Sequence, residues 1–316
     1  MVKGTKRRVL LTGATGFIGS AIHRGLTLAG LPDIRRLLRR DDPATPVDPA
    51  RAVRGDLTDP ASLHGICDGV EVVVHAASYI GADPRRNREV NHLGTCHLLA
   101  EAARADVRHV LYISTAAVYG TGPHQGPAEG VLAPAPGSPT SASRAAAEGE
   151  VLAHGGSVLR PHLVYGPGDR WVVPTLATLL RWLPGWIDGG RPRLSMIGVH
   201  DLARLVVALV STTPAPRGRV YHANHPDPVT VHAAGEALAR HLGTRLPTGD
   251  VSAAELANLA LPPGLRRRQL DLISMDHWYA SDRVWAATGC RPGAAFPNDL
   301  AHALQWYPDL AARHRT

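Results

Sequence analysis

The stretch TGATGFIGS, Thr12 to Ser20, decides the fold that this sequence predicts. It follows the short apolar run RVLLT and precedes apolar residues with helical spacing, so it predicts a strand, a tight turn and a helix. In such a turn Gly13 permits the sharp bend, Gly16 lets the backbone approach a pyrophosphate, and Gly19 lets the helix pack close to the strand. The unpaired N–H groups at the start of the helix attract phosphate. The context therefore predicts dinucleotide binding.

The order of strand and helix repeats along the first half of the chain. Apolar runs predict further strands at residues 34–40, 71–77, 109–114 and 157–161. Helical spacing predicts helices at residues 17–29, 59–66, 91–105, 141–154 and 200–210. Strands that alternate with helices of this length indicate a parallel sheet covered on both faces. We therefore expect an α/β fold of the Rossmann type, with a doubly wound parallel sheet.

The character of the sequence changes after Tyr165. The segment 171–190 is apolar, rich in Trp and interrupted by Pro and Gly, and the last ninety residues suggest irregular structure. We expect residues 1–165 and 197–224 to form the dinucleotide-binding domain. Residues 166–196 and 225–316 should form a smaller substrate lobe over the carboxyl edge of the sheet.

Composition restricts the class of protein and its partners. The net charge of the 316-residue chain is +7, but nearly all of the positive charge is Arg, which a GC-rich genome explains without a nucleic-acid partner. No apolar run is long enough to span a membrane, so we expect no membrane partner. Three distant cysteines predict neither a metal site nor a disulfide framework and fit a reducing cytoplasm. We expect a cytoplasmic monomer or homodimer.

The end of the second predicted strand discriminates between two dinucleotides. A carboxylate at this place would bind the ribose 2′-hydroxyl of NAD, whereas this chain has Arg39 and Arg40. Guanidinium groups pair with phosphate through two hydrogen bonds. The sequence therefore predicts a preference for NADP(H) over NAD(H). The alternative is a solvated arginine edge before Asp41 and Asp42.

Motifs along most of the chain resemble the extended short-chain dehydrogenase/reductase family, in its epimerase/dehydratase-like branch. They are TGATGFIG at 12–19, GDLTD at 55–59, VVVHAAS at 72–78, VNHLGT at 90–95, ISTAAVYG at 113–120, LRPHLVYGPGD at 159–169, VHDLA at 199–203 and QWY at 305–307. The resemblance implies a Rossmann domain with a small C-terminal substrate lobe. It also implies the cofactor contacts of particular residues.

The implied contacts run from the adenine to the nicotinamide. Asp56 and Leu57 should flank the adenine, Ala76 and Ala77 should line the nicotinamide ribose, and residues 161–163 should pass beside the nicotinamide. The expected cofactor-binding set is Thr12, Gly13, Thr15, Gly16, Phe17, Ile18, Gly19, Arg39, Arg40, Asp56, Leu57, Ala76, Ala77, Ser78, Asn91, Ser114, Arg144, Pro161, His162 and Leu163. The Ser114 side chain should be structural, because alternation along the strand turns it away from Thr115.

In the family that the chain resembles, a Ser or Thr, a Tyr and a Lys perform the chemistry. The motif ISTAAVYG places the hydroxyl residue at Thr115, but SPTSASRAAAE places Thr140 where the Tyr stands and Arg144 where the Lys stands. A phenol with a pKa near ~10 can be brought toward neutrality by a neighbouring ammonium group, whereas an aliphatic hydroxyl cannot. Thr140 is therefore no general acid. Tyr79 could replace the lost phenol, although a packing role for it is the stronger interpretation.

Three interpretations of function remain open. The first is an NADPH-dependent ketoreductase acting on an aromatic polyketide of the angucyclinone type in antibiotic biosynthesis, since the chain resembles polyketide ketoreductases that lack the Tyr and Lys. The final proton would come from water or from a phenol of the substrate, and Trp171, Trp182 and Trp186 would contact the aromatic rings. The second is a non-catalytic NADP(H)-binding sensor or scaffold. The third is a nucleotide-sugar-type epimerase or dehydratase.

Overall fold

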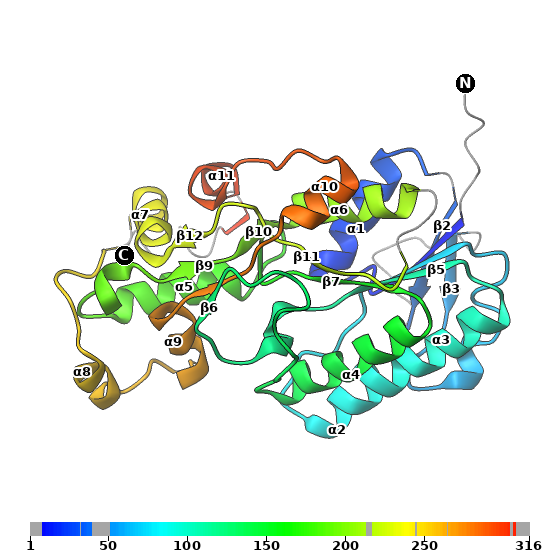
Figure 1. Ribbon diagram of the computed structural model, residues 1–316, viewed down its shortest axis with the longest axis horizontal. Coiled ribbons are helices and arrows are strands. Elements are labelled where there is room, and N and C mark those ends of the chain that lie inside the picture. The colour runs from blue at the N-terminus through cyan, green and yellow to red at the C-terminus, as the bar shows by residue number, and fades with distance from the viewer. Residues whose placement is uncertain are drawn as a thin grey trace.

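The computed structural model describes residues 8–31, 33–39, 51–212, 217–243, 245–263, 265–303 and 306–307. These residues form a larger α/β part and a smaller lobe beside it (Figure 1). None of the described helices combines the length and the apolarity that are needed to cross a bilayer.

A seven-stranded sheet forms the centre of the larger part, and every pair of neighbouring strands is parallel. The strand order is β11-β7-β5-β4-β1-β2-β3, which reverses at β1 as in doubly wound folds. The strands are β1 (Arg8–Thr12), β2 (Asp33–Leu38), β3 (Ala52–Arg54), β4 (Val72–His75), β5 (His109–Ile113), β7 (Ser157–Arg160) and β11 (Val220–His222). The predicted α/β fold of the Rossmann type is confirmed.

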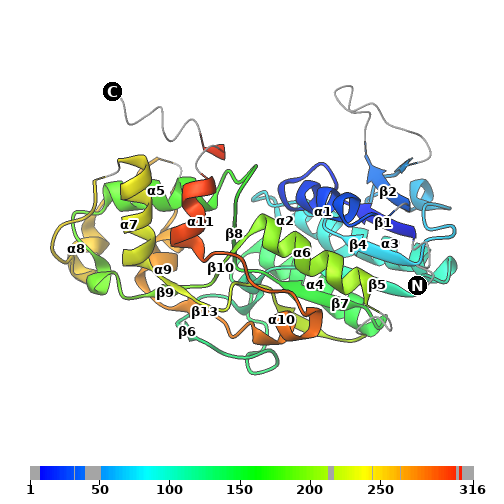
Figure 2. The same cartoon turned by 90° about the horizontal axis from the view of Figure 1, so that it is seen from above.

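Helices cover both faces of the sheet (Figures 1 and 2). One face carries α1 (Phe17–Leu28) and α6 (Val199–Ser211), whose apolar sides form one core with β1, β4, β5 and β7. The other face carries α3 (Gly94–Arg104) and α4 (Pro139–Ala153), which form a second core. Since β4 contributes Val72 and Val74 to one core and Val73 to the other, its apolar run is buried on both sides.

Two predicted helices differ from the structure in the segment between β3 and β5. The helix expected at 59–66 is a 3₁₀ turn, η2 (Pro60–Leu63), which Asp59 caps and after which Gly65 has a φ of +83°. The helix expected at 91–105 begins earlier, with α2 (Pro84–Asn87), and continues through a π-helical turn, η3 (Arg88–Leu93), into α3. The Asp83 carboxylate accepts from the N–H groups of Arg85 and Arg86 and so fixes this earlier start.

The smaller lobe is more regular than the sequence suggested. Its helices are α5 (Val172–Trp182), α7 (Val231–Leu242), α8 (Ala253–Asn258), α9 (Arg267–Ser274) and α11 (Phe296–Ala303). Its short strands are β6 (His124–Gln125), β9 (Arg193–Leu194), β12 (Val229–Thr230) and β13 (His277–Trp278), in the order β12-β9-β13-β6, with β8 (Leu163–Tyr165) and β10 (Met196–Gly198) as a separate pair. The expectation of irregular structure was wrong, because most of these elements are short and Pro and Gly lie between them, which obscures their periodicity in the sequence.

One segment of the expected lobe packs on the larger part instead. Helix α10 (Asp282–Thr288) places Val284 and Trp285 in the same core as α1 and α6. The Trp285 indole Nε1 donates to the Asn224 carbonyl oxygen at 2.8 Å. Residues 282–288 therefore contact the dinucleotide-binding part, although the expected boundary assigned 225–316 to the lobe.

Candidate cofactor and catalytic site

The glycine turn between β1 and α1 is built so closely that side chains do not fit. Gly13 has a φ of +69°, and a Cβ atom there would lie 2.6 Å from the Ala77 nitrogen, at the end of β4. A Cβ atom on Gly19 would lie 2.0 Å from the Gly13 oxygen. Helix α1 has no side-chain cap at Gly16, so its first N–H groups face the turn. The turn is thus a cradle of backbone N–H groups that suits a phosphate.

A buried chain of hydrogen-bonded polar groups fixes the residues on either side of the glycine turn. The Thr12 hydroxyl lies 2.7 Å from His75 Nδ1, and His75 Nε2 lies 3.0 Å from the Thr95 hydroxyl. The Ala77 N–H donates to the same Thr12 oxygen at 3.2 Å. Burial, and then the charge of Arg144, lower the pKa of His75 to about 3, so the ring is neutral at pH 7. His75 is a buried core histidine and joins the ends of β1 and β4 to α3.

A groove of about 580 Å³ runs from this turn along the carboxyl ends of the strands. Ten residues of the predicted cofactor set line it, namely Thr12, Gly13, Thr15, Gly16, Arg39, Asp56, Leu57, Ala76, Ala77 and Ser78. The structure thus brings together the glycine turn, the end of β2 and the end of β4. Phe17, Ile18 and Gly19 follow the turn in the first turn of α1.

Arginines and carboxylates gather at the far end of the groove, where Asp56, Asp83 and Glu89 line the same hollow as the arginines. Exposed Arg39 lines the groove and also a second hollow of about 400 Å³, which Arg85 and Arg86 line as well. Arg35, by contrast, donates to the Ile66 carbonyl oxygen at 2.8 Å and so holds a loop. Arg40 lies outside the described residues. The sequence did not identify Arg85 or Arg86, although the Asp-Pro pair before them signals the helix start that presents them.

Thr115 stands where β5 meets the loop that follows it. Its side chain is half-buried and caps the 3₁₀ turn η4 (Ala116–Tyr119) by accepting from the Ala117 N–H at 3.1 Å. The next N–H, of Ala116, donates to the Pro161 carbonyl oxygen at 2.8 Å. The Thr115 turn therefore adjoins residues 161–163.

Thr140 and Arg144, in the first turns of α4, bind the backbone of neighbouring segments. The Thr140 hydroxyl donates to the Gly81 carbonyl oxygen over a long 3.4 Å. The Arg144 guanidinium donates to the Ile113 carbonyl oxygen at 2.6 Å, at the carboxyl end of β5. These contacts attach α4 to the loop after β4 and to β5. A hydroxyl and a guanidinium thus stand where the resemblance expects a Tyr and a Lys.

Asn91 and Ser114, both in the predicted cofactor set, are buried. The Asn91 amide donates to the Tyr79 carbonyl oxygen at 2.9 Å and to the Ser143 hydroxyl at 3.0 Å, and its oxygen accepts from the Tyr79 N–H at 2.7 Å. Asn91 therefore holds the loop after β4 in place. The Ser114 hydroxyl has no hydrogen-bond partner among the described residues.

Of the seven tyrosines, all of them in the described residues, Tyr79 lines the groove. Its ring lies under Arg86, with the guanidinium carbon 4.7 Å from the ring centroid. Burial raises the pKa of each of the other phenols, those of Tyr112, Tyr119, Tyr165, Tyr221, Tyr279 and Tyr307. If a tyrosine of this chain donates a proton in the groove, Tyr79 is therefore the candidate.

A buried cluster of His and Tyr rings lies behind residues 161–163, and the sequence did not predict it. His162 stacks on His277 with ring centroids 5.8 Å apart, and the Tyr279 hydroxyl lies 2.8 Å from His124 Nδ1. Burial, and then the neighbouring His277 and His124, lower the pKa of His162 to about 3. The residues of this cluster are far apart in the sequence, so no motif or regular spacing predicted that they would meet. The cluster packs between the large sheet and the short strands of the lobe.

The three candidate tryptophans lie in different environments. Trp171, just before α5, is 63% exposed, and the same loop places Gly168 against the Phe17 ring at the glycine turn. Trp182 ends α5 and donates to the Ala260 carbonyl oxygen at 3.0 Å. Trp186 is in the lobe core, with its ring 4.7 Å from that of His232. Trp182 and Trp186 are four residues apart but do not share a helical face, because the helix stops before Leu183.

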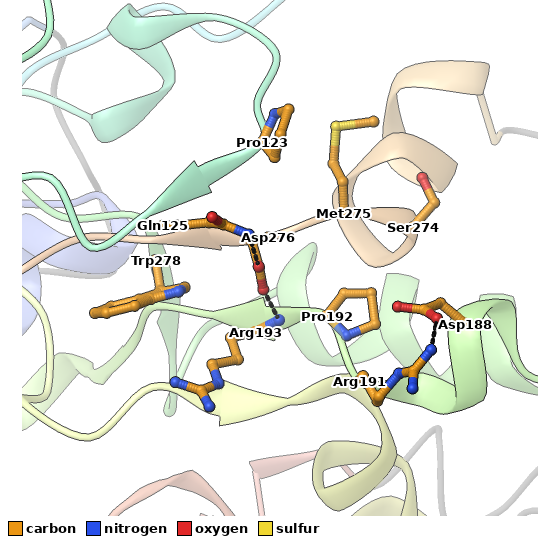
Figure 3. A pocket seen from close by; sticks show the side chains of 10 residues that line it. All are labelled: Pro123, Gln125, Asp188, Arg191, Pro192, Arg193, Ser274, Met275, Asp276 and Trp278. Atoms are coloured by element: carbon orange, nitrogen blue, oxygen red, sulfur yellow. Dashed lines mark hydrogen bonds and ion pairs between the residues drawn. The ribbon is translucent and has the colours of Figure 1, made fainter.

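The outer face of the lobe sheet carries a separate hollow of about 590 Å³ (Figure 3). Asp276 stands in it, accepting from Gln125 Nε2 at 2.8 Å and from the Arg193 N–H at 2.7 Å. Trp278 lies on the same side of β13, whereas His277 points to the buried face. None of the predicted site residues lines this hollow.

Residues 9–223 match the model of the NAD dependent epimerase/dehydratase family. The chain belongs to this family. The match spans the glycine turn, both strand ends that line the groove, and the Thr115 and Thr140 segments.

Two relatives of this epimerase/dehydratase family member are reductases. A 2-alkyl-3-oxoalkanoate reductase of Stenotrophomonas maltophilia is 34% identical over 188 residues, which are 55% of this chain and 56% of that protein. A ketoreductase of Stigmatella aurantiaca, named for 4-hydroxy-2-methyl-3-oxo-4-farnesyl-3,4-dihydroquinoline-1-oxide, is 28% identical over 77% of this chain and 76% of its own length. The chain thus spans little more than half the length of the first relative. These relatives and the family support an NAD(P)-dependent oxidoreductase.

Solved structures of the family share the fold over nearly the whole chain. A structure of RMD from Pseudomonas aeruginosa with NADPH has a TM-score of 0.72 and 23% identity, covering 97% of this chain and 99% of that one. The UDP-glucose 4-epimerase of Thermus thermophilus with NAD also has a TM-score of 0.72 and 23% identity, covering 95% and 99%. Both nucleotides therefore occur in chains of this fold.

Proposed function

We propose that this chain is an NADPH-dependent ketoreductase that reduces a carbonyl group of an aromatic polyketide of the angucyclinone type, without a Tyr/Lys proton relay. One observation carries the proposal. Thr115 presents a half-buried hydroxyl beside residues 161–163, whereas Thr140 and Arg144, which occupy the Tyr and Lys places, bind backbone carbonyl oxygens. The site therefore has a carbonyl-orienting group but lacks the usual proton donor.

The groove fits a dinucleotide on the chemistry of its own residues. The glycine cradle and the uncapped start of α1 suit a pyrophosphate, and Arg39, with Arg86 nearby, suits the additional phosphate of NADP(H). A bound reduced nicotinamide supplies the hydride. Among the chain's own residues, Ala76 and Ala77, which line the groove, and Pro161 would border the place where it reacts.

The reaction also needs a donor for the alkoxide oxygen. The Thr115 oxygen already accepts from the Ala117 N–H, so its own hydrogen is free to point at a substrate oxygen. A single positioned donor of this kind lowers a barrier by about 3 kcal/mol. The proton itself would come from a phenol of the substrate next to the ketone. That phenol transfers its proton to the new alkoxide and leaves a phenolate, which water reprotonates.

Exposed apolar groups near the groove favour an aromatic substrate. Trp171 is 63% exposed and Ile80, directly after Tyr79, is 61% exposed. Large apolar side chains so exposed near a binding groove are typical of contacts with an apolar ligand. The alternative substrate, a nucleotide sugar, would need polar partners at these positions.

The test is reduction of a panel of polyphenolic ketones by purified protein with NADPH, followed by loss of absorbance at the reduced nicotinamide band. Turnover that Thr115→Ala lowers and Thr115→Ser restores supports the proposal. Cofactor binding by calorimetry is measured in parallel. Tight NADPH binding without turnover of any ketone would overturn it in favour of an NADP(H)-binding sensor or scaffold. Interconversion of nucleotide sugars would favour the epimerase or dehydratase interpretation.

A further inference from the structure

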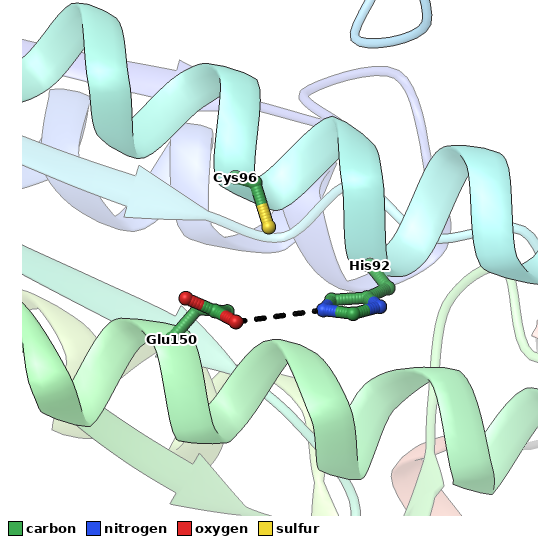
Figure 4. Close-up of side chains that lie close together, drawn as sticks. All are labelled: His92, Cys96 and Glu150. Atoms are coloured by element: carbon green, nitrogen blue, oxygen red, sulfur yellow. Dashed lines mark ion pairs between the residues drawn. The ribbon is translucent and has the colours of Figure 1, made fainter.

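Three side chains that bind metals in other proteins meet on the outer side of the larger part. His92 lies on η3, Cys96 on α3 and Glu150 on α4, and they point toward one another across the space between these helices (Figure 4). Their ligand atoms all lie within 4.8 Å of one another. Within the residues that the structure describes, no second group of three such side chains comes so close.

The local structure of the chain explains the grouping. His92 and Cys96 are four residues apart, so they share a helix face. Helix α4 packs along this face, and the Asn91 amide joins it by donating to the Ser143 hydroxyl at 3.0 Å. Glu150 stands two turns further along α4 than Ser143, which places it opposite Cys96. The three groups therefore converge from two rigid helices and not from mobile loops.

The distances suit a small tetrahedral ion. Zinc bonds of about 2.0–2.3 Å place neighbouring ligand atoms roughly 3.3–3.8 Å apart. His92 Nε2 and a Glu150 carboxylate oxygen already lie 3.6 Å apart. Because all three ligand atoms lie within 4.8 Å of one another, the remaining approach needed for bonding is about an ångström or less.

We propose that His92, Cys96 and Glu150 form a site for a divalent transition-metal ion of the Zn²⁺ class, with water as the fourth ligand. Nitrogen, sulfur and carboxylate ligands together are typical of zinc, and Mg²⁺ and Ca²⁺ prefer oxygen alone. The carboxylate is 43% exposed and the imidazole 25% exposed, so an ion and a water molecule can reach the site. Bound metal would join α4 to η3 and α3.

The site lies on the helix side of the sheet, apart from the groove, so the inference does not depend on the reductase proposal.

Cobalt provides a specific probe, because a thiolate bound to Co²⁺ gives a charge-transfer band in the near ultraviolet that other ligands do not give. One equivalent of Co²⁺ added to the chelator-treated full chain should produce this band, and one equivalent of Zn²⁺ should remove it. Cys96→Ser should abolish the band. Its matched control, Cys290→Ser, changes a half-buried cysteine elsewhere in the chain and should leave the band unchanged.

Zinc affinity provides the second readout. His92→Ala should weaken Zn²⁺ binding at least about 100-fold. Loss of a residue that only hydrogen-bonds to a metal ligand already costs up to about 100-fold in affinity, and loss of the ligand itself costs more. The control His64→Ala removes an exposed histidine on another segment. Zn²⁺ should raise the melting temperature of the wild type and of both controls, but not that of Cys96→Ser or His92→Ala. Absence of the band in the wild type, or an equal band in Cys96→Ser, would overturn the inference.

Discussion

The glycine turn after β1 and the first turns of α4 differ in what builds them. The turn is made of backbone, and a single Cβ atom on Gly19 would collide with the Gly13 oxygen at 2.0 Å. The start of α4 presents side chains, and Thr140 and Arg144 make different contacts from those expected of a Tyr and a Lys without disturbing the helix. A site built from backbone atoms tolerates few substitutions and therefore keeps the same kind of ligand. A site built from side chains can change its chemistry by substitution while the fold stays the same.

The two regions are joined through a few buried polar groups. His75 lies between Thr12 and Thr95, and Asn91 joins the loop after β4 to Ser143 on α4. The Gly81 carbonyl oxygen of that loop accepts from Thr140. The groove and the first turns of α4 are therefore positioned by the same loop. Variants in each region separate cofactor binding from proton transfer.

The largest effect is expected from Gly19→Ala. The added Cβ has no space against the Gly13 oxygen, so the turn must open, with a loss of about 3 kcal/mol of unfolding free energy. NADPH binding should become undetectable by calorimetry. Gly149→Ala is the matched control, because a Cβ there meets nothing within 4 Å on a helix. Cofactor binding close to that of the wild type in Gly19→Ala would show that the turn is not the phosphate cradle.

Thr115→Ala should have the next largest effect. The variant loses the donor to the substrate carbonyl oxygen, so kcat should fall about 100-fold while the dissociation constant for NADPH stays within a factor of three. Steady-state kinetics with a reducible ketone measures the first value and calorimetry the second. An unchanged kcat would remove Thr115 from the proposed chemistry.

Arg39→Ala tests the choice of dinucleotide and should have a moderate effect. Arg39 is exposed, so its contact with a 2′-phosphate is partly screened, and NADPH should bind about 10-fold more weakly. Binding of NADH should be unchanged. Arg181→Ala removes an exposed arginine of α5 and serves as the control. Equal losses for both nucleotides in Arg39→Ala would assign the side chain a general electrostatic role.

Thr140→Ala should have the smallest effect. The hydroxyl donates one long hydrogen bond to the Gly81 oxygen and is no general acid, so kcat should stay within about threefold of the wild type. Deletion of a general acid costs about 10²–10⁴-fold. A loss in that range would contradict the assignment and return Thr140 to the reaction.

The sequence predicted the geometry of the glycine turn after β1 better than the side-chain contacts at the start of α4. Gly13, Gly16 and Gly19 have a spacing that one local geometry explains, and the strand ends that line the groove follow from the strand order. The assignment of Thr140 and Arg144 to the Tyr and Lys places also came from the sequence and stays a prediction. The sequence could not give the hydrogen-bond partners of these residues, because the Gly81 and Ile113 oxygens are contributed by other elements.

Contacts between distant segments account for most of what the sequence did not reveal. Arg85 and Arg86 reach the hollow beside Arg39 from α2, which the helix prediction missed. His162 and His277 lie far apart in the sequence and stack in the structure. The separation of Trp182 from Trp186 depends on where α5 stops, and such a boundary is poorly defined by periodicity alone.

The measurement that tests the central claim most directly compares two ketones, one with a free phenol next to the carbonyl group and one with that oxygen methylated. Single-turnover reduction by NADPH-loaded protein is followed for both. If the substrate supplies the proton, the methyl ether should bind with similar affinity and be reduced at least about 100-fold more slowly. Equal rates for the two ketones would contradict the account, place the proton donor in the protein, and make Tyr79→Phe the next variant to examine.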